Sequence, residues 1–192
     1  MTEATAANSK SAKQAWIRAL ERTASIDRDG ITLPLLIDRL AQRYGTAPAL
    51  ESAEAALSYR ELALRCNQYA RWGLAQGLRP GDTVCLMMQN CAEYMAIWLG
   101  LTRIGAVVAL INNNLAGDAL AHSINIVAPK GVIVGGELAP RLAAVRARLS
   151  ARPPCWVCGQ SAEDIAALDS EVGRCSGEPL HDGECAPVPV GA

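Results

Sequence analysis

Two cysteines three residues apart, Cys155 and Cys158, are the residues whose types and spacing could most directly do chemistry. A Cys-x-x-Cys pair acts as a redox couple when its first thiol begins a helix, because the helix dipole lowers the pKa of that thiol. The two residues between these cysteines are Trp and Val, which favour a strand. Side chains at positions i and i+3 of a strand point to opposite faces, so we expect the two sulfur atoms to diverge.

A zinc site is the second interpretation of the same pair. Structural zinc takes four ligands, and Cys175, Cys185 and His181 could complete the set. The spacings match no usual zinc ribbon or finger. We therefore expect plain thiols, with the redox and zinc interpretations as open alternatives. The seven cysteines are an odd number without a visible export signal, which argues against a disulfide framework.

Other polar candidates give weak signals. Asn112, Asn113 and Asn114 follow an expected strand, where open parallel sheets usually place ligand-facing loops. Asparagine also favours turns, so we expect turn formation here rather than ligand contact. His122 lies on an expected helix without a partnered nucleophile and is expected to be a packed or half-exposed helix residue; His181 is expected to be solvated. The sequence contains neither Gly-x-Gly-x-x-Gly nor Gly-Lys-Ser/Thr, so no catalytic, cofactor-binding or metal-binding residue is predicted.

The elements that would position these residues alternate along the chain. Short apolar runs predict strands that are covered on both faces, at 84–88, 107–111, 131–134 and 155–158. Apolar residues at helical spacing predict helices at 15–24, at 34–44, after Ser58, after Asn90, at 118–127 and at 138–149. Ser58 with Glu61 forms a capping box, and Asn90 is expected to cap its helix. This alternation predicts an α/β fold with an open parallel sheet and helices on both faces.

Three segments are expected along the chain. Residues 1–13 are polar and predicted to be disordered, residues 14–160 form the α/β unit, and residues 161–192 form a loop-rich acidic tail. The helix around Trp16 is expected to pack against the domain. Attachment of that helix to a membrane surface is the alternative.

Composition excludes several classes of function. The net charge of −1 gives no basic field for nucleic acid, and aromatic residues make up only 4% of the chain. No run of about 18 apolar residues is present that could span a membrane. The polar residues at the N-terminus lack the apolar core of a secretory signal. These observations predict a cytoplasmic protein, with peripheral membrane association left open.

Several motifs in residues 57–134 carry a family resemblance. They are Leu-Ser-Tyr-Arg-Glu-Leu from Leu57, Gly-Leu-Arg-Pro-Gly-Asp from Gly77, Asn-Cys-Ala-Glu-Tyr from Asn90, Trp-Leu-Gly-Leu-Thr-Arg-Ile-Gly-Ala from Trp98 and Ile-Asn-Asn-Asn-Leu-Ala-Gly from Ile111. In this order they resemble the N-terminal part of the acyl-adenylate-forming superfamily, most of all its long-chain fatty acyl-CoA synthetase and fatty-acid transport protein branch. Asn113, Asn114 and Ala116 depart from the pattern expected of that branch.

The resemblance implies a fold and an activity. The chain would be the first flavodoxin-like subdomain, incomplete, of a synthetase that converts a fatty acid, ATP and coenzyme A to acyl-CoA, AMP and pyrophosphate with magnesium. The family's Ser/Thr/Gly-rich phosphate loop and its catalytic lysine are expected beyond residue 192. The resemblance therefore implies a truncated N-terminal part that is inactive and needs no cofactor of its own. The alternative is a stand-alone binding or regulatory half-domain, which could be one piece of a split synthetase. A lone sheet layer of this kind would expose apolar surface, so self-association is expected of it, whereas a sharp monomer with a cooperative melt would favour the stand-alone module.

Overall fold

The computed structural model describes residues 13–22, 32–52, 55–160, 165–181 and 183–184. The chain divides into two units, Met1–Ile31 with Val190–Ala192, and Thr32–Pro189. In the first unit, the described residues 13–22 are helical, which agrees with the helix expected over 15–24 as far as residue 22; residues 23 and 24 lie outside the described residues. The disorder predicted for residues 1–13 falls, except for Lys13, outside the described residues. The packing of this helix against the domain stays a prediction.

The second unit is built around a five-stranded sheet. All neighbouring strands pair in parallel, in the order β4-β3-β5-β6-β7. The strands are β3 (Thr83–Met87), β4 (Val107–Leu110), β5 (Gly131–Gly135), β6 (Cys155–Cys158) and β7 (Ala166–Ala167). This confirms the predicted open parallel sheet and four of its strands.

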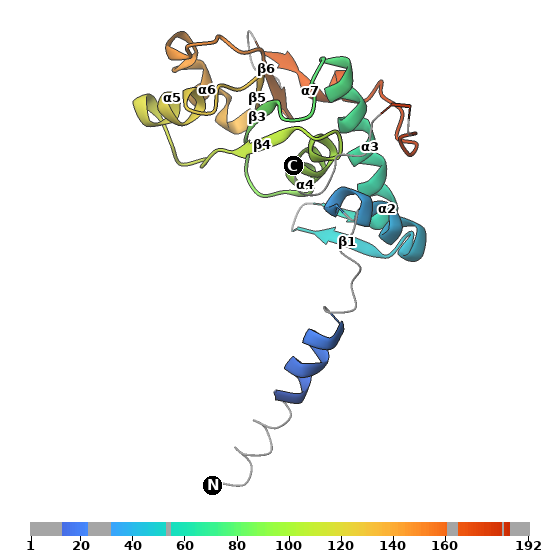
Figure 1. Ribbon diagram of the computed structural model, residues 1–192. Coiled ribbons are helices and arrows are strands. Elements are labelled where there is room, and N and C mark those ends of the chain that lie inside the picture. Colours follow the sequence, from blue (N-terminus) through green and yellow to red (C-terminus); the bar gives the residue numbers. More distant parts are fainter. Residues whose placement is uncertain (1–12, 23–31, 53–54, 161–164, 182, 185–192) are drawn as a thin grey trace, which may run out of the picture. The chain divides into compact units, whose positions relative to one another are not determined.

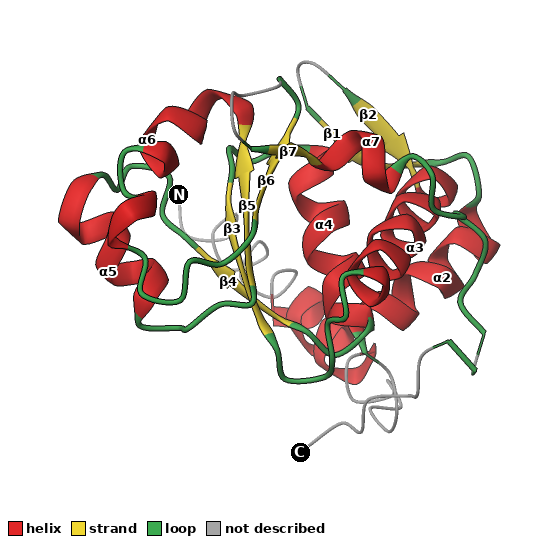
Figure 2. Cartoon of the chain, turned by 90° about the horizontal axis from the view of Figure 1, so that it is seen from above, coloured by secondary structure: helices red, strands yellow, loops and turns green. Residues whose placement is uncertain are grey.

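Helices cover both faces of this sheet. Figure 2 shows the sheet edge-on, with α5 and α6 on one side and α2, α3, α4 and α7 on the other. The α-helices are α2 (Leu33–Tyr44), α3 (Tyr59–Ala75), α4 (Ala92–Arg103), α5 (Gly117–Asn125), α6 (Ala139–Ala143) and α7 (Leu168–Val172). Two 3₁₀ turns, η1 (Gly136–Leu138) and η2 (Arg146–Arg148), flank α6. Figure 1 follows the same order along the chain.

Alternating side chains divide the core into two clusters, one on each face of the sheet. Leu86 of β3 packs in the cluster beneath α3 and α4, whereas Cys85 and Met87 pack in the cluster beneath α5 and α6. All three side chains are fully buried. A strand buried on both faces reads as a continuous apolar run, which explains why these strands were predictable.

Helices α3 and α4 pack against each other at close range. The predicted capping box begins α3, because the backbone N–H of Ser58 donates to Glu61 Oε2 at 2.8 Å and the Glu61 N–H donates to Ser58 Oγ at 3.3 Å. Gly100 of α4 lies directly against α3, where a Cβ atom would stand 2.5 Å from the carbonyl oxygen of Cys66. The helix interface therefore requires glycine at this position.

Two local predictions were wrong. Asn90 does not cap α4; the cap is Cys91, whose Sγ accepts the N–H of Tyr94 at 3.4 Å. Hydrophobic spacing locates a helix but does not fix its first residue. The single helix expected over 138–149 is interrupted, because η1, α6 and η2 share that stretch.

Two further elements did not follow from the sequence pattern. Strands β1 (Pro48–Glu51) and β2 (Ala56–Ser58) pair antiparallel before α3. The tail predicted as loop contains β7 and α7, and Leu168 and Val172 of α7 are buried in the core. Residues 173–181 form neither helix nor strand, as expected. The boundaries 14–160 and 161–192 stay predictions.

Candidate functional site

The carboxyl ends of β3, β5 and β6 meet at a pocket of about 560 Å³, which we call the carboxyl-end pocket. Open parallel sheets usually bind ligands at this edge. The strand ends supply Met88, Gly135 and Cys158, and helices and loops supply the rest of the lining, which is Arg65, Gln89, Cys91, Glu93, Glu137, Gly159 and Asp169.

The charged groups of the carboxyl-end pocket are mostly acidic, and two of the three carboxylates already have partners. Glu93 accepts a hydrogen bond from the buried Tyr69 hydroxyl and lies 3.6 Å from Arg65 Nη2. Asp169 accepts the Gly159 N–H at 2.7 Å. Glu137 lies exposed over Gly135. With three carboxylates against one guanidinium, this pocket opposes the approach of an anion.

The Cys155–Cys158 pair diverges as predicted. Cys155 packs in the cluster beneath α5 and α6, and Cys158 packs in the cluster on the opposite face of β6. Burial raises the pKa of both thiols, and the neighbouring Asp169 carboxylate raises that of Cys158 further. A thiol with a raised pKa is a poor nucleophile. This geometry argues against a redox couple.

A zinc site also finds no support. Among the described residues, no group of three or more His, Cys, Asp or Glu side chains could hold a metal ion. The described cysteines are free thiols. Cys185, one of the ligands weighed for zinc, lies outside the described residues.

The asparagine segment forms a turn, as expected. Asn112 Oδ1 accepts the N–H of Asn114 at 2.9 Å, and Asn113 Nδ2 donates to Gln89 Oε1 at 2.9 Å. None of these three asparagines lines the carboxyl-end pocket or the second cavity, at the opposite end of the sheet, although Gln89 lines the carboxyl-end pocket. His181 is exposed, as expected, whereas His122 on α5 is exposed rather than packed or half-exposed, so that prediction was wrong.

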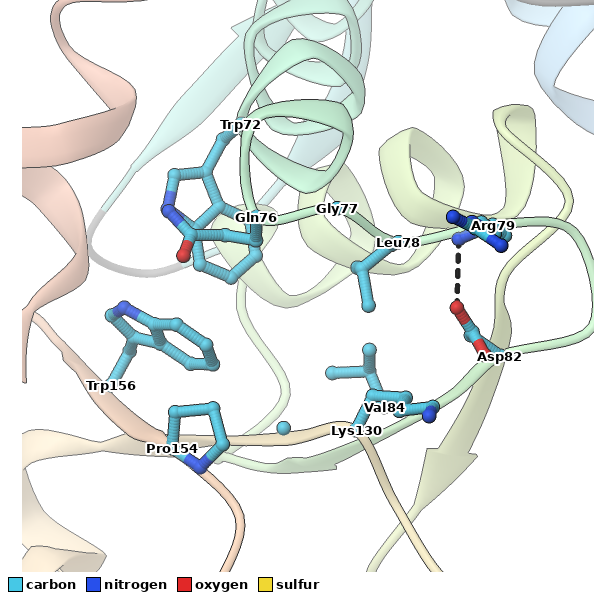
Figure 3. A pocket seen from close by; sticks show the side chains of 11 residues that line it. Trp72, Gln76, Gly77, Leu78, Arg79, Asp82, Val84, Lys130, Pro154 and Trp156 are labelled. Atoms are coloured by element: carbon cyan, nitrogen blue, oxygen red, sulfur yellow. Dashed lines mark hydrogen bonds between the residues drawn. The ribbon is translucent and has the colours of Figure 1, made fainter.

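A second cavity lies at the opposite end of the sheet, and we call it the amino-end cavity. Its volume is about 370 Å³. Asp82, Lys130 and Pro154 line it, and each of them directly precedes a strand. The end of α3 and its following turn supply Trp72, Gln76, Gly77, Leu78 and Arg79. Figure 3 shows these side chains converging on one space. Sequence reasoning used Gly77 to Asp82 only as a motif of the family resemblance and missed this cavity.

Similarity to known proteins assigns the family. The sequence profile described as "AMP-binding enzyme" matches residues 37–184, which is more than half of the chain. The chain belongs to the AMP-binding enzyme family. Both clusters of the sheet core and both cavities fall inside the matched residues, so the fold described above is that of the family's N-terminal region.

Relatives of this family member act on fatty acids according to their names. It is 34% identical over 125 residues to long-chain fatty acid transport protein 6 of Mus musculus, covering 64% of this chain and 20% of the relative. It is 31% identical over 103 residues to medium/long-chain-fatty-acid–CoA ligase FadD6 of Mycobacterium tuberculosis, covering 54% of this chain and 17% of the ligase. The chain thus spans about a fifth of the length of these relatives.

Solved structures show the same fold. The anthranilate CoA ligase AuaEII, in complex with anthranoyl-AMP, superposes with a TM-score of 0.77 at 18% identity, over 86% of this chain and 31% of the ligase. A putative long-chain-fatty-acid CoA ligase from Rhodopseudomonas palustris gives 0.71 at 24% identity, over 80% and 38%. The predicted likeness to the N-terminal part of the fatty acyl-CoA synthetase branch is therefore confirmed.

The family works with ATP, magnesium and coenzyme A, and the carboxyl-end pocket does not fit the phosphates of ATP. A triphosphate needs cations or several backbone donors at its oxygens. The one cation among the described residues of the lining is Arg65, and it already pairs with Glu93. Next to the pocket, the backbone of Gly136 packs closely against the backbone of Gln160, which leaves no space there for a phosphate group. No step of the family reaction can be routed through these residues.

Proposed function

We propose that this chain forms the first sheet layer of an AMP-forming fatty acyl-CoA synthetase and does not itself activate a fatty acid. The parent reaction would join a fatty acid to coenzyme A, with ATP cleaved to AMP and pyrophosphate. The family match over residues 37–184 and the fatty-acid relatives support the first part of this proposal.

The charge of the carboxyl-end pocket is the observation that supports inactivity. Attack of a carboxylate on the α-phosphate requires donors and cations that neutralise the phosphate oxygens. Glu93, Glu137 and Asp169 supply negative charge at the edge of the sheet where a ligand would be expected.

Pyrophosphate exchange tests the proposal. The purified chain is incubated with ATP, magnesium, labelled pyrophosphate and palmitate, with the mycobacterial ligase FadD6 as the positive control. We expect label in ATP only in the control. Exchange that co-purifies with this chain and depends on palmitate would overturn the proposal.

A half-domain that binds another polypeptide is the second candidate, and the edge strand β4 favours it. Val107 and Leu110 of β4 are 52% and 45% exposed, and β4 pairs on only one side among the described strands. Exposed apolar side chains on a free strand edge promote association. We expect concentration-dependent self-association in light scattering after size-exclusion chromatography. A sharp monomer with a cooperative melt would count against self-association through β4.

We place the protein in the cytoplasm, with peripheral contact to membranes. Among the described helices, none is long and apolar enough to cross a bilayer. The helix at 13–22 carries the apolar residues Trp16, Ile17 and Leu20, which suit an interfacial position. Co-sedimentation with anionic vesicles tests this, and a Trp16→Ser variant that sediments as well as the parent would contradict it.

A further inference from the structure

The amino-end cavity has two chemically different ends. Figure 3 shows Trp72, Trp156 and Pro154 gathered at one end, with Arg79, Asp82 and Lys130 at the other. The apolar side chains of Leu78 and Val84 lie between them. A ligand that filled this space would therefore need an apolar body and a polar head.

The aromatic end is rigidly held. The Trp72 and Trp156 rings meet edge to face, with centroids 4.9 Å apart and planes at 86°. Glu171 of α7 accepts the Trp72 indole N–H at 2.8 Å and the Gln76 amide N–H at 3.2 Å. At Gly131 a Cβ atom would stand 2.6 Å from the Trp156 ring, so glycine lets that indole lie against β5. These contacts fix an apolar wall before any ligand arrives, which lowers the entropic cost of binding.

The charged end carries uncompensated positive charge. Asp82 Oδ2 accepts the backbone N–H of Arg79 at 2.8 Å, so this carboxylate is already engaged by the turn. The side chains of Arg79 and Lys130 are exposed and form no ion pair with any residue that the structure describes. Two cations therefore face the rim against one carboxylate. This balance is the reverse of that in the carboxyl-end pocket.

We propose that the amino-end cavity binds a small organic monoanion with a flat apolar body, such as an aromatic carboxylate. The ring would pack against the accessible edge of the Trp156 indole, which the buried Trp72 ring supports from behind, and the carboxylate would accept charge-assisted hydrogen bonds from Arg79 and Lys130. The volume of about 370 Å³ falls within the range of small-molecule sites. This proposal does not depend on the proposed function, because it concerns the other end of the sheet.

Calorimetric titration with 2-naphthoate, and with the neutral alcohol 2-naphthalenemethanol, tests the proposal. We expect saturable one-site binding of the acid, about tenfold tighter than that of the alcohol, because hydrogen bonds to a charged group are the stronger kind. The double variant Arg79→Gln/Lys130→Gln should bind both compounds equally. Arg39→Gln, which removes one charge from an exposed position on α2, should bind like the parent.

Two results would overturn the proposal. Equal affinity of the parent chain for acid and alcohol would show that Arg79 and Lys130 do not recognise the carboxylate. Absence of saturable acid binding would show that the cavity is not a binding site for such an anion. The substituted cations are exposed, so these variants are expected to fold. Gly131→Ala provides a second readout, because a displaced Trp156 ring should weaken acid and alcohol by the same factor. Parent-like binding by this variant would contradict the aromatic wall.

Discussion

The two ends of the sheet differ in how their polar groups are used. At the carboxyl ends of the strands, Glu93 and Asp169 accept hydrogen bonds from neighbours, and the remaining charge is negative. At the amino ends, Asp82 is engaged by its own turn, while Arg79 and Lys130 have no ion-pair partner among the described residues. The edge where α/β folds usually bind ligands is thus the less suited to an anion.

This difference shows which features come from the family's strand topology and which come from the particular residues in the loops. The topology brings three strand ends together at both edges, so each edge is hollowed. Only the chemistry of the loops decides which hollow can bind a ligand. In this chain, the aromatic packing of Trp72 with Trp156 gives the amino-end cavity a fixed wall.

Removal of an aromatic ring should produce the largest effect. Trp156→Ala is expected to lower the free energy of unfolding by about 3–5 kcal/mol, because a buried indole and its contact with Trp72 are lost. Urea denaturation measures this. The matched change at the other edge, Glu137→Gln, should stay within about 0.5 kcal/mol because that side chain is exposed. Equal losses of unfolding free energy from the two changes would contradict the expected difference between the amino-end cavity and the carboxyl-end pocket.

The buried Tyr69 hydroxyl should come next. Tyr69→Phe deprives Glu93 of its buried donor and should cost about 1.5–3 kcal/mol, the usual range for a hydrogen bond to a charged group. Glu93→Gln retains an acceptor oxygen and should cost less in the same urea titration. If Glu93→Gln were the more damaging change, the ion pair with Arg65 would outweigh this hydrogen bond.

Thiol labelling should distinguish the carboxyl-end pocket from the buried core without loss of stability. Burial raises the pKa of Cys66 and Cys85 to about 12, so little thiolate is present at pH 8. The half-buried Cys91 at the carboxyl-end pocket should react first with iodoacetamide, at least about hundredfold faster than Cys85. Peptide mass mapping over time measures these rates. Rapid joint modification or bridging of Cys155 and Cys158 would revive the redox interpretation.

The smallest effect concerns the tail segment that lies along α3. Arg71 donates to Glu184 Oε1 at 2.9 Å and to the carbonyl oxygens of Ser176 and Pro179. The hydrogen bond from Arg71 to the Glu184 carboxylate, followed by that from the His181 backbone N–H, lowers the pKa of Glu184 to about 2 from its ordinary value of 4.5. A lowered pKa means that the contact contributes fully above about pH 4.5 and is lost as the pH falls through about 2.

Hydrogen exchange of the amides between Ser176 and His181 checks this pH range. At pH 6, Glu184→Gln should lower the protection of these amides against exchange. The remaining protection, after correction for the intrinsic exchange rates, should equal that of the parent near pH 2. Glu178→Gln, an exposed position in the same segment, should leave exchange unchanged. If the parent lost protection already near pH 4.5, Arg71 would not be the partner that matters.

The parts of this chain that could be predicted are those whose burial requires a recognisable pattern of apolar residues in the sequence. The run from Val84 to Met88 identified a central strand because both of its faces are covered. The divergence of Cys155 from Cys158 followed from strand geometry alone. The family likeness followed from motifs at the turns and helix starts.

The remainder depended on contacts distant in sequence. Helix α7 was missed because it is short, although Leu168 and Val172 at positions i and i+4 both point into the core. The amino-end cavity was missed because Trp72, Lys130 and Trp156 come from three elements whose approach only the sheet order determines. The cap of α4 is a smaller example: the sequence located the helix but predicted Asn90 as its cap, and the structure has Cys91 there.

One pair of titrations followed by ¹H–¹⁵N correlation spectra tests the central contrast most directly. We predict that 2-naphthoate shifts the Trp156 and Trp72 indole signals and the backbone signals of Lys130 and Gly77, whereas ATP with magnesium shifts none of the signals of Gly135, Gly136 and Gly159. Saturable ATP-induced shifts at those three glycines, with no response of the indoles to 2-naphthoate, would contradict the account.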